Sequence, residues 1–563
     1  MTKRIFALIL CIIMTVPFFA GCSTYDPDED LGETINIYLG DEIYDFDPAY
    51  AYRSNEAMQF TRLLFAGLFY IDEDGKLQND LVKKYKIEDD DDQGIYTITF
   101  TLKETYWSDG SLVSAKDILF AWKRLLDPTC VSDAAALLYE IRNAYDAKNG
   151  NCSVDDIGVY AIDNSTLQIA FDQPIDYKDF LYNLASPCLV PVRQTAVKDN
   201  ADWAKRPYTT VCSGPFLIRE VEYGKSLTLE RNSYYMRDRE KDSIKEAVTP
   251  YRIVIDYTKN AEKQLEAYEN GEISFVGDIA LSKRADYASE AKVYNALSTL
   301  SCYFNLENDI FANADTRKAL SSAIDRAAVA EKLVFAEAAT ALVPTGVFEA
   351  KSAKKSFRSV GGDLIENDVQ STGSFNGEFT LAIADNEVHS AVAEMLKAAW
   401  EKLGFKVNVV KLATSATDVI LPNEDKPTKE FVNDDYLTAL KNGEFDVILA
   451  DVSALDTDAF SMLAPFAAGY SGRDIKFTVD SHIDALNITG YNSEAYNALI
   501  DNALAEKDVA KRASILHDAE KLLMEDLPVC PIVFTKKAVL SSSIKNVETD
   551  YFANFLFDKA ELK

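Results

Sequence analysis

The sequence predicts an α/β protein with mixed sheets and at least two lobes. The first observation behind this prediction is a pattern that occurs three times, in which a helical stretch, a glycine and a strand follow one another. Such an order is typical of α/β folds, because glycine readily adopts the left-handed conformation that ends a helix. The second observation is the length of 563 residues, which exceeds what one hydrophobic core normally holds. Two or more packed lobes are therefore expected.

The three helix-glycine-strand units lie in the middle and the second half of the chain. In KQLEAYENGEISFVG, a helix is expected to end at Asn270 and Gly271, before an alternating strand. In AVAEMLKAAWEKLGFKVNVV, apolar residues at helical spacing lead to Gly404, and a strand with alternating apolar residues follows. In YLTALKNGEFDVILAD, Gly443 separates a helix from a nearly continuous apolar strand. These units predict helices and strands in alternation.

One hairpin is predicted earlier in the chain, next to an acidic run. Residues 95–102 contain YTITF, whose alternation is typical of a strand in a hairpin. The run EDDDD at 88–92, like DEDG at 72–75, lacks the ligand spacing and the distant glutamate of a calcium loop. Both runs are interpreted as turns, and no metal site is predicted.

The composition argues against one class of partner. Hydrophobic residues make up 48% and charged residues 26% of the chain, which are ordinary values for globular proteins. The formal net charge is -32. Nucleic acid is therefore not expected as a partner, since phosphate binding requires a basic surface.

The N-terminus has the features of an export signal. A positive start precedes an apolar run over residues 5–19, which is shorter than the roughly 20 residues of a membrane span. Small residues then precede Cys22, an arrangement that resembles a bacterial lipobox, although Phe19 stands where leucine is usual. We predict a lipoprotein signal peptide over residues 1–21, lipidation of Cys22, for example with palmitate, and an acidic tether over residues 22–35.

These features predict an extracytoplasmic protein that is lipid-anchored to the bacterial cell membrane. The tether sequence is polar, acidic and poor in apolar residues, as a solvated linker should be. The alternative is an ordinary signal peptide followed by a chance cysteine.

The remaining cysteines allow disulfides without specifying them. Six are left once the leader and the predicted lipidation site are set aside, and their spacings are wide. An exported chain permits disulfides, and Cys188 with Cys212 would be the first pair to test. Buried unpaired thiols are the alternative. The six are Cys130, Cys152, Cys188, Cys212, Cys302 and Cys530.

Catalytic motifs are missing from the sequence. It contains no GxSxG nucleophile elbow, no HExxH and no P-loop. The three histidines, His389, His482 and His517, are far apart and form no ligand-spaced pair. We therefore expect a binding protein without cofactor or metal, and no enzyme.

A series of motifs then carries a family resemblance. DFDPAYAYRSNEAMQFTRLLFAGLFYIDEDGKL begins at Asp45, and YWSDGSLVSAKDILFAWKRLLDP begins at Tyr106. IGVYAIDNSTLQIAF, CSGPFLIREVEYGKSLTLERNSYY, CYFNLEN and GYNSEAYNALID follow in order. Over about residues 36–563, the chain resembles the extracellular solute-binding proteins of family 5, the oligopeptide-binding proteins that feed ABC importers.

The resemblance implies a two-lobed type II periplasmic-binding-protein fold with an extra inserted subdomain in lobe one. Lobe one would comprise residues 36–300, with the inserted subdomain at about 65–187. Lobe two would comprise residues 301–526, and residues 527–563 would return to lobe one. The two crossings, near Leu300 and Leu527, would form a hinge.

The resemblance also implies a function. Members of the family close on a solute and hand it to a membrane permease. An oligopeptide is the expected ligand, ABC transporter permease subunits are the expected partners, and the protein is expected to be a monomer. The alternative is the same fold with a non-peptide solute, such as an oligosaccharide or a metal chelate, or with a signalling peptide.

Seven ligand-binding residues are expected from the resemblance. Relatives that bind peptides place an aspartate for the peptide ammonium just after the strand that matches FDVILAD, but an ungapped match puts Leu455 there. Asp456 is the expected ammonium partner, with Asp451 and Ser453 lining the site. The alternative is that these acids cap a helix that begins near Asp458.

The other expected contacts come from lobe one and from the hinge. Tyr52, Arg53 and Asn55 lie in the loop that faces the ligand in relatives. Phe534 follows the late strand near the hinge.

Overall fold

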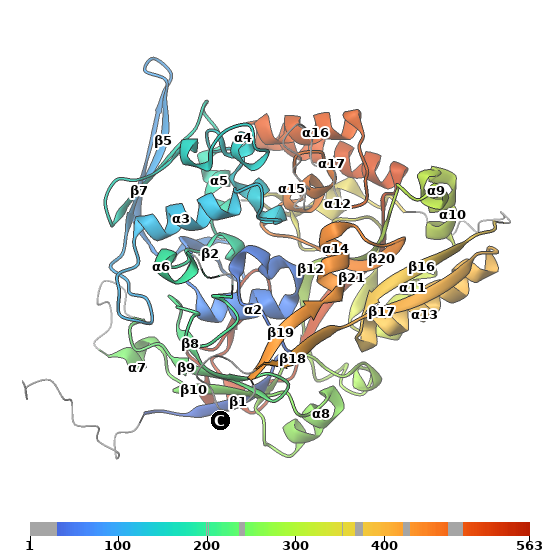
Figure 1. The fold of residues 1–563 in the computed structure, drawn as a ribbon, viewed down its shortest axis with the longest axis horizontal. Helices are drawn as coiled ribbons and strands as arrows, with labels where there is room; N and C mark the ends of the chain where they lie inside the picture. The colour runs from blue at the N-terminus through green and yellow to red at the C-terminus, as the bar shows by residue number, and fades with distance from the viewer. Residues whose placement is uncertain are drawn as a thin grey trace, which may run out of the picture. The chain divides into compact units, whose positions relative to one another are not determined.

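Three sheets of four or more strands organise the part of the chain that the computed structural model describes (Figure 1). The described residues are 31–198, 200, 202–235, 243–351, 353–365, 375–419, 428–470 and 488–563. Residues 33–563 form one compact unit. The predicted signal peptide, Cys22 and the tether up to residue 30 lie outside the described residues. Among the residues that are described, no helix has the length and apolar character needed to cross a bilayer.

The first sheet belongs to lobe one and has the strand order β11-β1-β10-β9-β8. β1 runs parallel to both neighbours, β10 and β11, whereas β9 is antiparallel to β10. Ile35 and Ile37 of β1 are buried and Asn36 between them is exposed, because successive side chains of a strand point to opposite faces. The strands are β1 (Thr34–Tyr38), β8 (Phe216–Glu222), β9 (Ser226–Arg231), β10 (Arg252–Asp256) and β11 (Phe275–Val276). The adjoining helices are η1 (Pro48–Arg53), α2 (Asn55–Leu64), α7 (Ile244–Ala247) and α8 (Ala261–Glu269).

The second sheet is antiparallel, has the order β4-β5-β7-β6 and lies in the predicted inserted subdomain. β5 has the limits predicted for the hairpin strand, and Gly94 in the turn before it has a φ of 63°, so the hairpin prediction is confirmed. The strands are β4 (Val82–Asp90), β5 (Ile95–Leu102), β6 (Val159–Ala161) and β7 (Thr166–Ala170). The helices around it are α3 (Ala115–Leu125), η2 (Asp133–Leu138), α4 (Ala144–Lys148), α5 (Tyr177–Asn183), η4 (Pro187–Leu189) and α6 (Gln194–Val197).

The third sheet forms lobe two, with the order β13-β21-β12-β20-β16-β17. Helices lie beside it in the view of Figure 1, with α13 next to β16 and β17. The strands are β12 (Lys292–Phe304), β13 (Ala336–Ala338), β16 (Glu378–Ala384), β17 (Lys406–Leu412), β20 (Val447–Ser453) and β21 (Val529–Val539). The longer helices are α10 (Ala314–Ser322), α11 (Arg326–Leu333), α13 (Glu387–Lys402), α14 (Asp435–Asn442), α16 (Glu494–Ala505) and α17 (Val509–Asp526), and α15 (Phe460–Leu463) is a single turn.

All three predicted helix-glycine-strand units are confirmed. They are α8 to β11, α13 to β17 and α14 to β20. The glycines between them, Gly271, Gly404 and Gly443, have φ values of 74°, 106° and 67°. A Cβ at Gly404 would collide with the carbonyl oxygen of Phe375, so both conformation and space require glycine there.

Two long strands, β12 and β21, connect the lobes. They pair from Lys292 opposite Val539 to Tyr303 opposite Val529, with an irregular register between Asn295 and Thr299. Within that irregularity, Leu297 has a φ of 52°, a left-handed conformation that is uncommon for leucine.

The chain returns to lobe one after β21. Leu540 pairs with Val276, next to the first sheet, and the side chain of Gln59 exchanges hydrogen bonds with the main chain of Phe555. Phe555 and Phe557 both pack against Phe275, with ring centroids 5.0 and 5.1 Å away. The last strands are β22 (Ile544–Lys545), β23 (Glu548–Thr549), β24 (Phe555–Leu556) and β25 (Glu561–Leu562).

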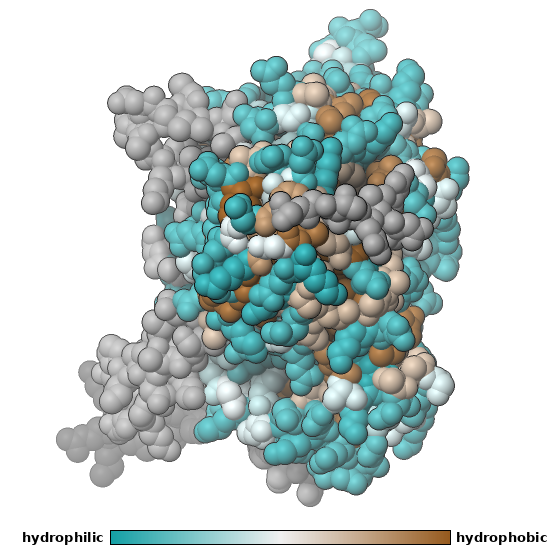
Figure 2. All heavy atoms as spheres, turned by 90° about the vertical axis from the view of Figure 1, so that its right-hand side faces the viewer, coloured by the Kyte–Doolittle hydropathy of each residue, from teal (hydrophilic) through white to brown (hydrophobic). Residues whose placement is uncertain are grey.

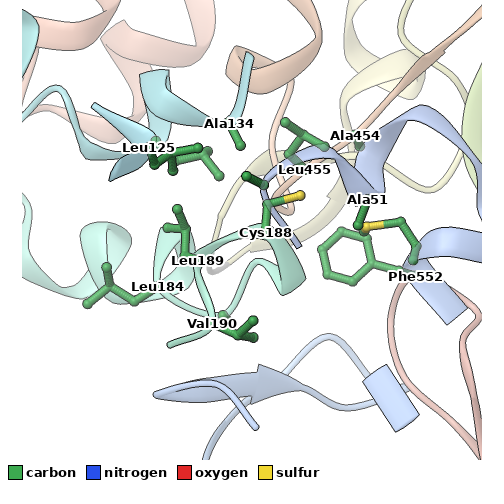
Figure 3. Packing of buried hydrophobic residues seen from close by; sticks show 14 of the residues in the cluster. Ala51, Leu125, Ala134, Leu184, Cys188, Leu189, Val190, Ala454, Leu455 and Phe552 are labelled. Atoms are coloured by element: carbon green, nitrogen blue, oxygen red, sulfur yellow. The ribbon is translucent and has the colours of Figure 1, made fainter. Parts of the chain in front are cut away.

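The largest apolar core draws residues from both lobes and from the inserted subdomain. Figure 3 shows one region of it, in which Ala51 of lobe one, Cys188 of the inserted subdomain and Leu455 of lobe two lie near one another. All six cysteines that the structure describes are unpaired, including Cys188 and Cys212. On the face drawn in Figure 2, hydrophilic residues cover most of the surface and hydrophobic residues form smaller groups between them.

Candidate functional site

A cleft of about 1320 Å³ lies between the two lobes. Lobe one contributes the end of β1, the loop after it, η1 and the start of α2, together with residues 257–261 and 277–279. Lobe two contributes residues 384–389, the start of α14 and the end of β20. Residues 535–538 of β21 line the cleft at the connection between the lobes. The site is therefore built from segments far apart in sequence.

The end of β20 presents an open strand edge to this cleft. β20 pairs with β12 as far as Ser453, but it pairs with β16 only at Val447 and Ile448. Beyond Ile448, no described strand pairs with that edge of β20. The hydroxyl of Tyr436 donates to the carbonyl oxygen of Leu449 at 2.8 Å, and the following residues line the cleft. An extended chain in the cleft could pair with this edge through main-chain hydrogen bonds.

Asp451 lies on that edge, exposed in the cleft. The hydroxyl of Ser298 donates to Asp451 Oδ1 at 2.9 Å, and Ser453 Oγ donates to Ser298 Oγ at 3.2 Å. Among the described residues, no ion pair reaches Asp451. Desolvation by the cleft raises the pKa of its carboxyl, although the hydrogen bond from Ser298 opposes this. The carboxylate is thus oriented but has no counter-charge.

The structure does not bring Asp456 to the cleft. Its side chain is fully buried, accepts a hydrogen bond from Ser461 Oγ at 2.7 Å, and lies 3.7 Å from Lys351 Nζ. Burial and the nearby Asp458 raise its pKa to about 7, while Lys351 lowers it. The residue before it, Leu455, packs against the apolar core and lines the cleft, whereas Asp456 lies in the interior beside Ser461 and Lys351.

Asp458 lies two residues before α15 and binds the first main-chain N–H of that helix, although Ala459 occupies the N-cap position. Its Oδ1 accepts from the backbone N–H of Phe460 at 2.9 Å, at the start of α15, and its other oxygen pairs with Arg512. The Arg512 guanidinium holds the pKa of Asp458 below its usual range in spite of burial.

Three of the lobe-one predictions lie on the cleft wall. Arg53 Nη2 donates to the carbonyl oxygen of Val131 at 2.8 Å, and the Tyr52 hydroxyl accepts from the backbone N–H of Asp133 at 3.2 Å. Asn55 is exposed at the start of α2. Of the expected residues, the cleft thus brings together these three with Asp451 and Ser453.

Phe534 lies outside the lining of the cleft. It is buried in β21, opposite Thr299, and its neighbour Thr535 faces the cleft instead.

Several lining residues were not predicted. Residues 384–389 follow the carboxyl end of β16 and begin α13, a place where α/β sheets commonly bind ligands, so the strand-helix pattern could have indicated them. The lining tyrosines give no such signal, since aromatic residues on strands usually belong to a core. These are Tyr38, Tyr44, Tyr50, Tyr257, Tyr303 and Tyr436.

The cleft is strongly acidic. Eleven aspartate and glutamate side chains line it, against five lysine and arginine side chains. Each of these five cations contacts a protein carboxylate or carbonyl group, as in the pairs Lys259 with Glu272 and Lys536 with Glu337. A cationic group would be favoured in such a cleft.

The described histidines do not form a catalytic group. His389 is buried, and its Nδ1 accepts from the backbone N–H of Ala384 at 3.2 Å. His517 stacks on Phe357 and contacts Glu349 at 2.9 Å, away from the cleft lining. His482 lies outside the described residues.

Comparison with curated proteins finds relatives of nearly equal length. The dipeptide-binding protein DppE of Bacillus subtilis is 26% identical over 540 residues, which cover 92% of this chain and 90% of DppE. The oligopeptide-binding protein OppA of Bacillus subtilis is 24% identical over 568 residues, with 96% and 95% coverage.

Comparison with solved structures supports the two-lobed fold. The murein tripeptide binding protein MppA of Escherichia coli has a TM-score of 0.75 at 22% identity, covering 94% of this chain and 98% of MppA. The unliganded open form of MppA gives a TM-score of 0.56 at 22% identity, with 94% and 97% coverage.

The fold is the α/β, two-lobed type II periplasmic-binding-protein fold that was predicted. The family model described as bacterial extracellular solute-binding proteins, family 5, matches residues 76–474, which is more than half of the chain. The match confirms the resemblance seen in the sequence. The chain belongs to the bacterial extracellular solute-binding proteins of family 5.

Proposed function

We propose that this protein captures oligopeptides in the cleft between its lobes and delivers them to the permease of an ABC transporter. The observation that carries the proposal is the open edge of β20, from Ala450 to Ser453, which lines the cleft. The printed names of DppE and OppA, a dipeptide-binding and an oligopeptide-binding protein, support the same ligand class.

A strand edge suits a peptide better than other solutes. Every peptide has the same main chain, so hydrogen bonds to that chain hold peptides of many sequences. A sugar or a metal chelate has no regular series of donors and acceptors to match an extended strand. The volume of about 1320 Å³ leaves room for side chains and water around such a peptide.

The peptide ammonium requires a carboxylate when the cleft closes over it, because a buried charge without a partner is costly. Asp451 is the carboxylate that we assign to it. It lies on the same strand edge, it is held by Ser298, and its remaining lone pairs face the cleft. Asp456, which the sequence favoured, is turned toward Lys351 in the interior.

The remaining parts of the proposal concern location and partners. We propose that Cys22 is lipidated after removal of residues 1–21, so that the protein is held at the outer face of the cell membrane beside its permease. We propose further that it acts as a monomer without cofactor and binds its solute without chemical change.

The test begins with the ligands that the purified protein carries. Mass spectrometry of the small molecules released on denaturation should find short peptides. Calorimetry with defined peptides should then show binding, and N-acetylation should weaken it. Release of an oligosaccharide or a metal chelate, with no binding of any peptide, would replace peptide by the other solute class.

A further inference from the structure

We propose that the cleft holds a second cation site, which selects peptides with a lysine or arginine side chain. The site, called the acidic pocket below, rests on the proposed peptide-binding function and is separate from Asp451. Its residues are Tyr38, Asp41, Glu56, Asp278 and Glu387, all of which line the cleft.

Four separate segments bring these carboxylates together. Asp41 follows β1, Glu56 lies in the first turn of α2, Asp278 follows β11, and Glu387 is the first residue of α13 in lobe two. Glu56 lies against Gly40, where an added Cβ would be 2.8 Å from its Oε1. Glu387 Oε2 accepts from the backbone N–H of Leu281 at 3.2 Å, three residues after Asp278. Both lobes therefore contribute to the acidic pocket.

Tyr38 is the second observation that indicates a ligand here. The side chain is only 5% exposed, yet it lines the cleft, and none of the described residues forms a hydrogen bond with its hydroxyl. Tyr38 pairs with Val276 of β11, two residues before Asp278, and lies three residues before Asp41. Burial and the four carboxylates of the pocket raise the pKa of this phenol. The hydroxyl at the end of this nearly buried side chain is open to the cleft, so it can bind a polar group of the solute.

The charges in the pocket are not balanced by the protein. Arg284 pairs with Asp278 at 3.3 Å, and Lys537 donates to the carbonyl oxygen of Ala553 at 3.3 Å. Burial and the neighbouring carboxylates raise the pKa of Glu56 to about 7 and that of Asp278 to about 6. Such shifts mean that a further positive charge in the pocket would be stabilised.

The spacing of these carboxylates favours an ammonium or guanidinium group over a metal ion. Among the described residues, no three aspartate, glutamate, histidine or cysteine side chains are close enough to hold a metal ion. A divalent ion would need such a compact oxygen shell. An ammonium or guanidinium group has several donors directed outward, so it can bridge carboxylates that are farther apart and also the Tyr38 hydroxyl. In a peptide, only lysine and arginine side chains reach such a pocket from the main chain.

The test compares peptides that differ in one side chain. Tetra-alanine is varied one position at a time to lysine, to norleucine, which has a similar length without charge, and to glutamate. Calorimetry on the full protein should give at least about tenfold tighter binding for lysine than for norleucine at one position, which corresponds to about 1.4 kcal/mol. Glutamate at that position should bind more weakly than norleucine.

Two variants then assign the effect to the acidic pocket. Glu56→Gln combined with Asp278→Asn should remove most of the lysine preference, measured as the ratio of the dissociation constants of the norleucine and lysine peptides in the same variant. Asp41→Asn, at an exposed position, should reduce the preference without a risk to folding. The control is Glu378→Gln, an exposed carboxylate on β16 outside the cleft lining, which should leave the preference unchanged.

The outcomes separate this inference from the proposed function. If lysine and norleucine peptides bind equally at every position, the acidic pocket does not select cations and only this inference fails. The same holds if the preference survives in both pocket variants. If no tetrapeptide binds at all, the proposed function itself fails.

Discussion

Replacing Asp451 by asparagine removes a charge from the cleft and leaves the shape of the side chain nearly unchanged. In the structure this carboxylate accepts one hydrogen bond, from Ser298, and has no cation beside it among the described residues. If the peptide ammonium is its partner, the variant loses one hydrogen bond between charged groups, which is worth about 1.5 to 3 kcal/mol. Peptide affinity should therefore fall about 10- to 150-fold.

Calorimetry with tetra-alanine and its N-acetylated form measures this loss. Acetylation removes the same charge from the ligand, so it should weaken binding to the wild-type protein strongly and binding to Asp451→Asn only slightly. The two losses should thus not add, since both remove the same interaction. Full additivity of the two effects would refute the assignment of the ammonium to Asp451.

Asp456→Asn is the matched control. It makes the same chemical change five residues away, in a fully buried group that contacts Ser461 and Lys351. We expect an altered unfolding midpoint and an unchanged dissociation constant for tetra-alanine. Weaker peptide binding in Asp456→Asn, together with normal binding in Asp451→Asn, would reverse the assignment.

Three further predictions concern pH, stability and the anchor. The preference for lysine over norleucine peptides should grow from pH 5 to pH 8. The reason is that a lysine side chain binds best to the ionised forms of Glu56 and Asp278, whose pKa values are raised. An equal preference across this pH range in calorimetry would contradict the pocket. The charged groups that act on these two carboxylates are Asp41, Glu387, Arg284 and Lys537. Glu520→Gln should lower the free energy of unfolding, measured by urea denaturation, by about 3 to 5 kcal/mol, because it breaks the buried ion pair with Arg358. If the free energy of unfolding falls no more than in Glu378→Gln, the ion pair contributes little to stability. Cys22→Ser should abolish incorporation of labelled fatty acid and release the protein into the soluble fraction, whereas equal labelling of variant and wild type would exclude lipidation at this position.

Local patterns in the sequence predicted local structure well. The stops at Gly271, Gly404 and Gly443 and the strand at 95–102 could be predicted because each depends on a few neighbouring residues. A left-handed glycine and an alternating strand need no information about distant segments. The family motifs then supplied what spacing could not, namely the order of the lobes.

The candidate site was predictable only in part. The loop with Tyr52 and Arg53 and the strand end with Asp451 were found through the family motifs, and both line the cleft. Whether a carboxylate after β20 faces the cleft depends on how Leu455 packs against other segments, and this contact involves residues remote in sequence. The acidic pocket draws on four separate segments, so no single stretch of sequence carries its signal.

The left-handed Leu297 in β12 has a consequence for the balance between conformations. A non-glycine residue in such a conformation costs of the order of 1 to 3 kcal/mol, and neighbouring contacts keep it there, among them the hydrogen bond from the Ala454 N–H to its carbonyl oxygen at 2.9 Å. Any arrangement of the lobes that lets Leu297 relax regains that free energy. The free-energy difference between the major and minor conformations of a protein is also typically a few kcal/mol. A solute that binds one arrangement of the lobes therefore has to outweigh only a small difference at this strand.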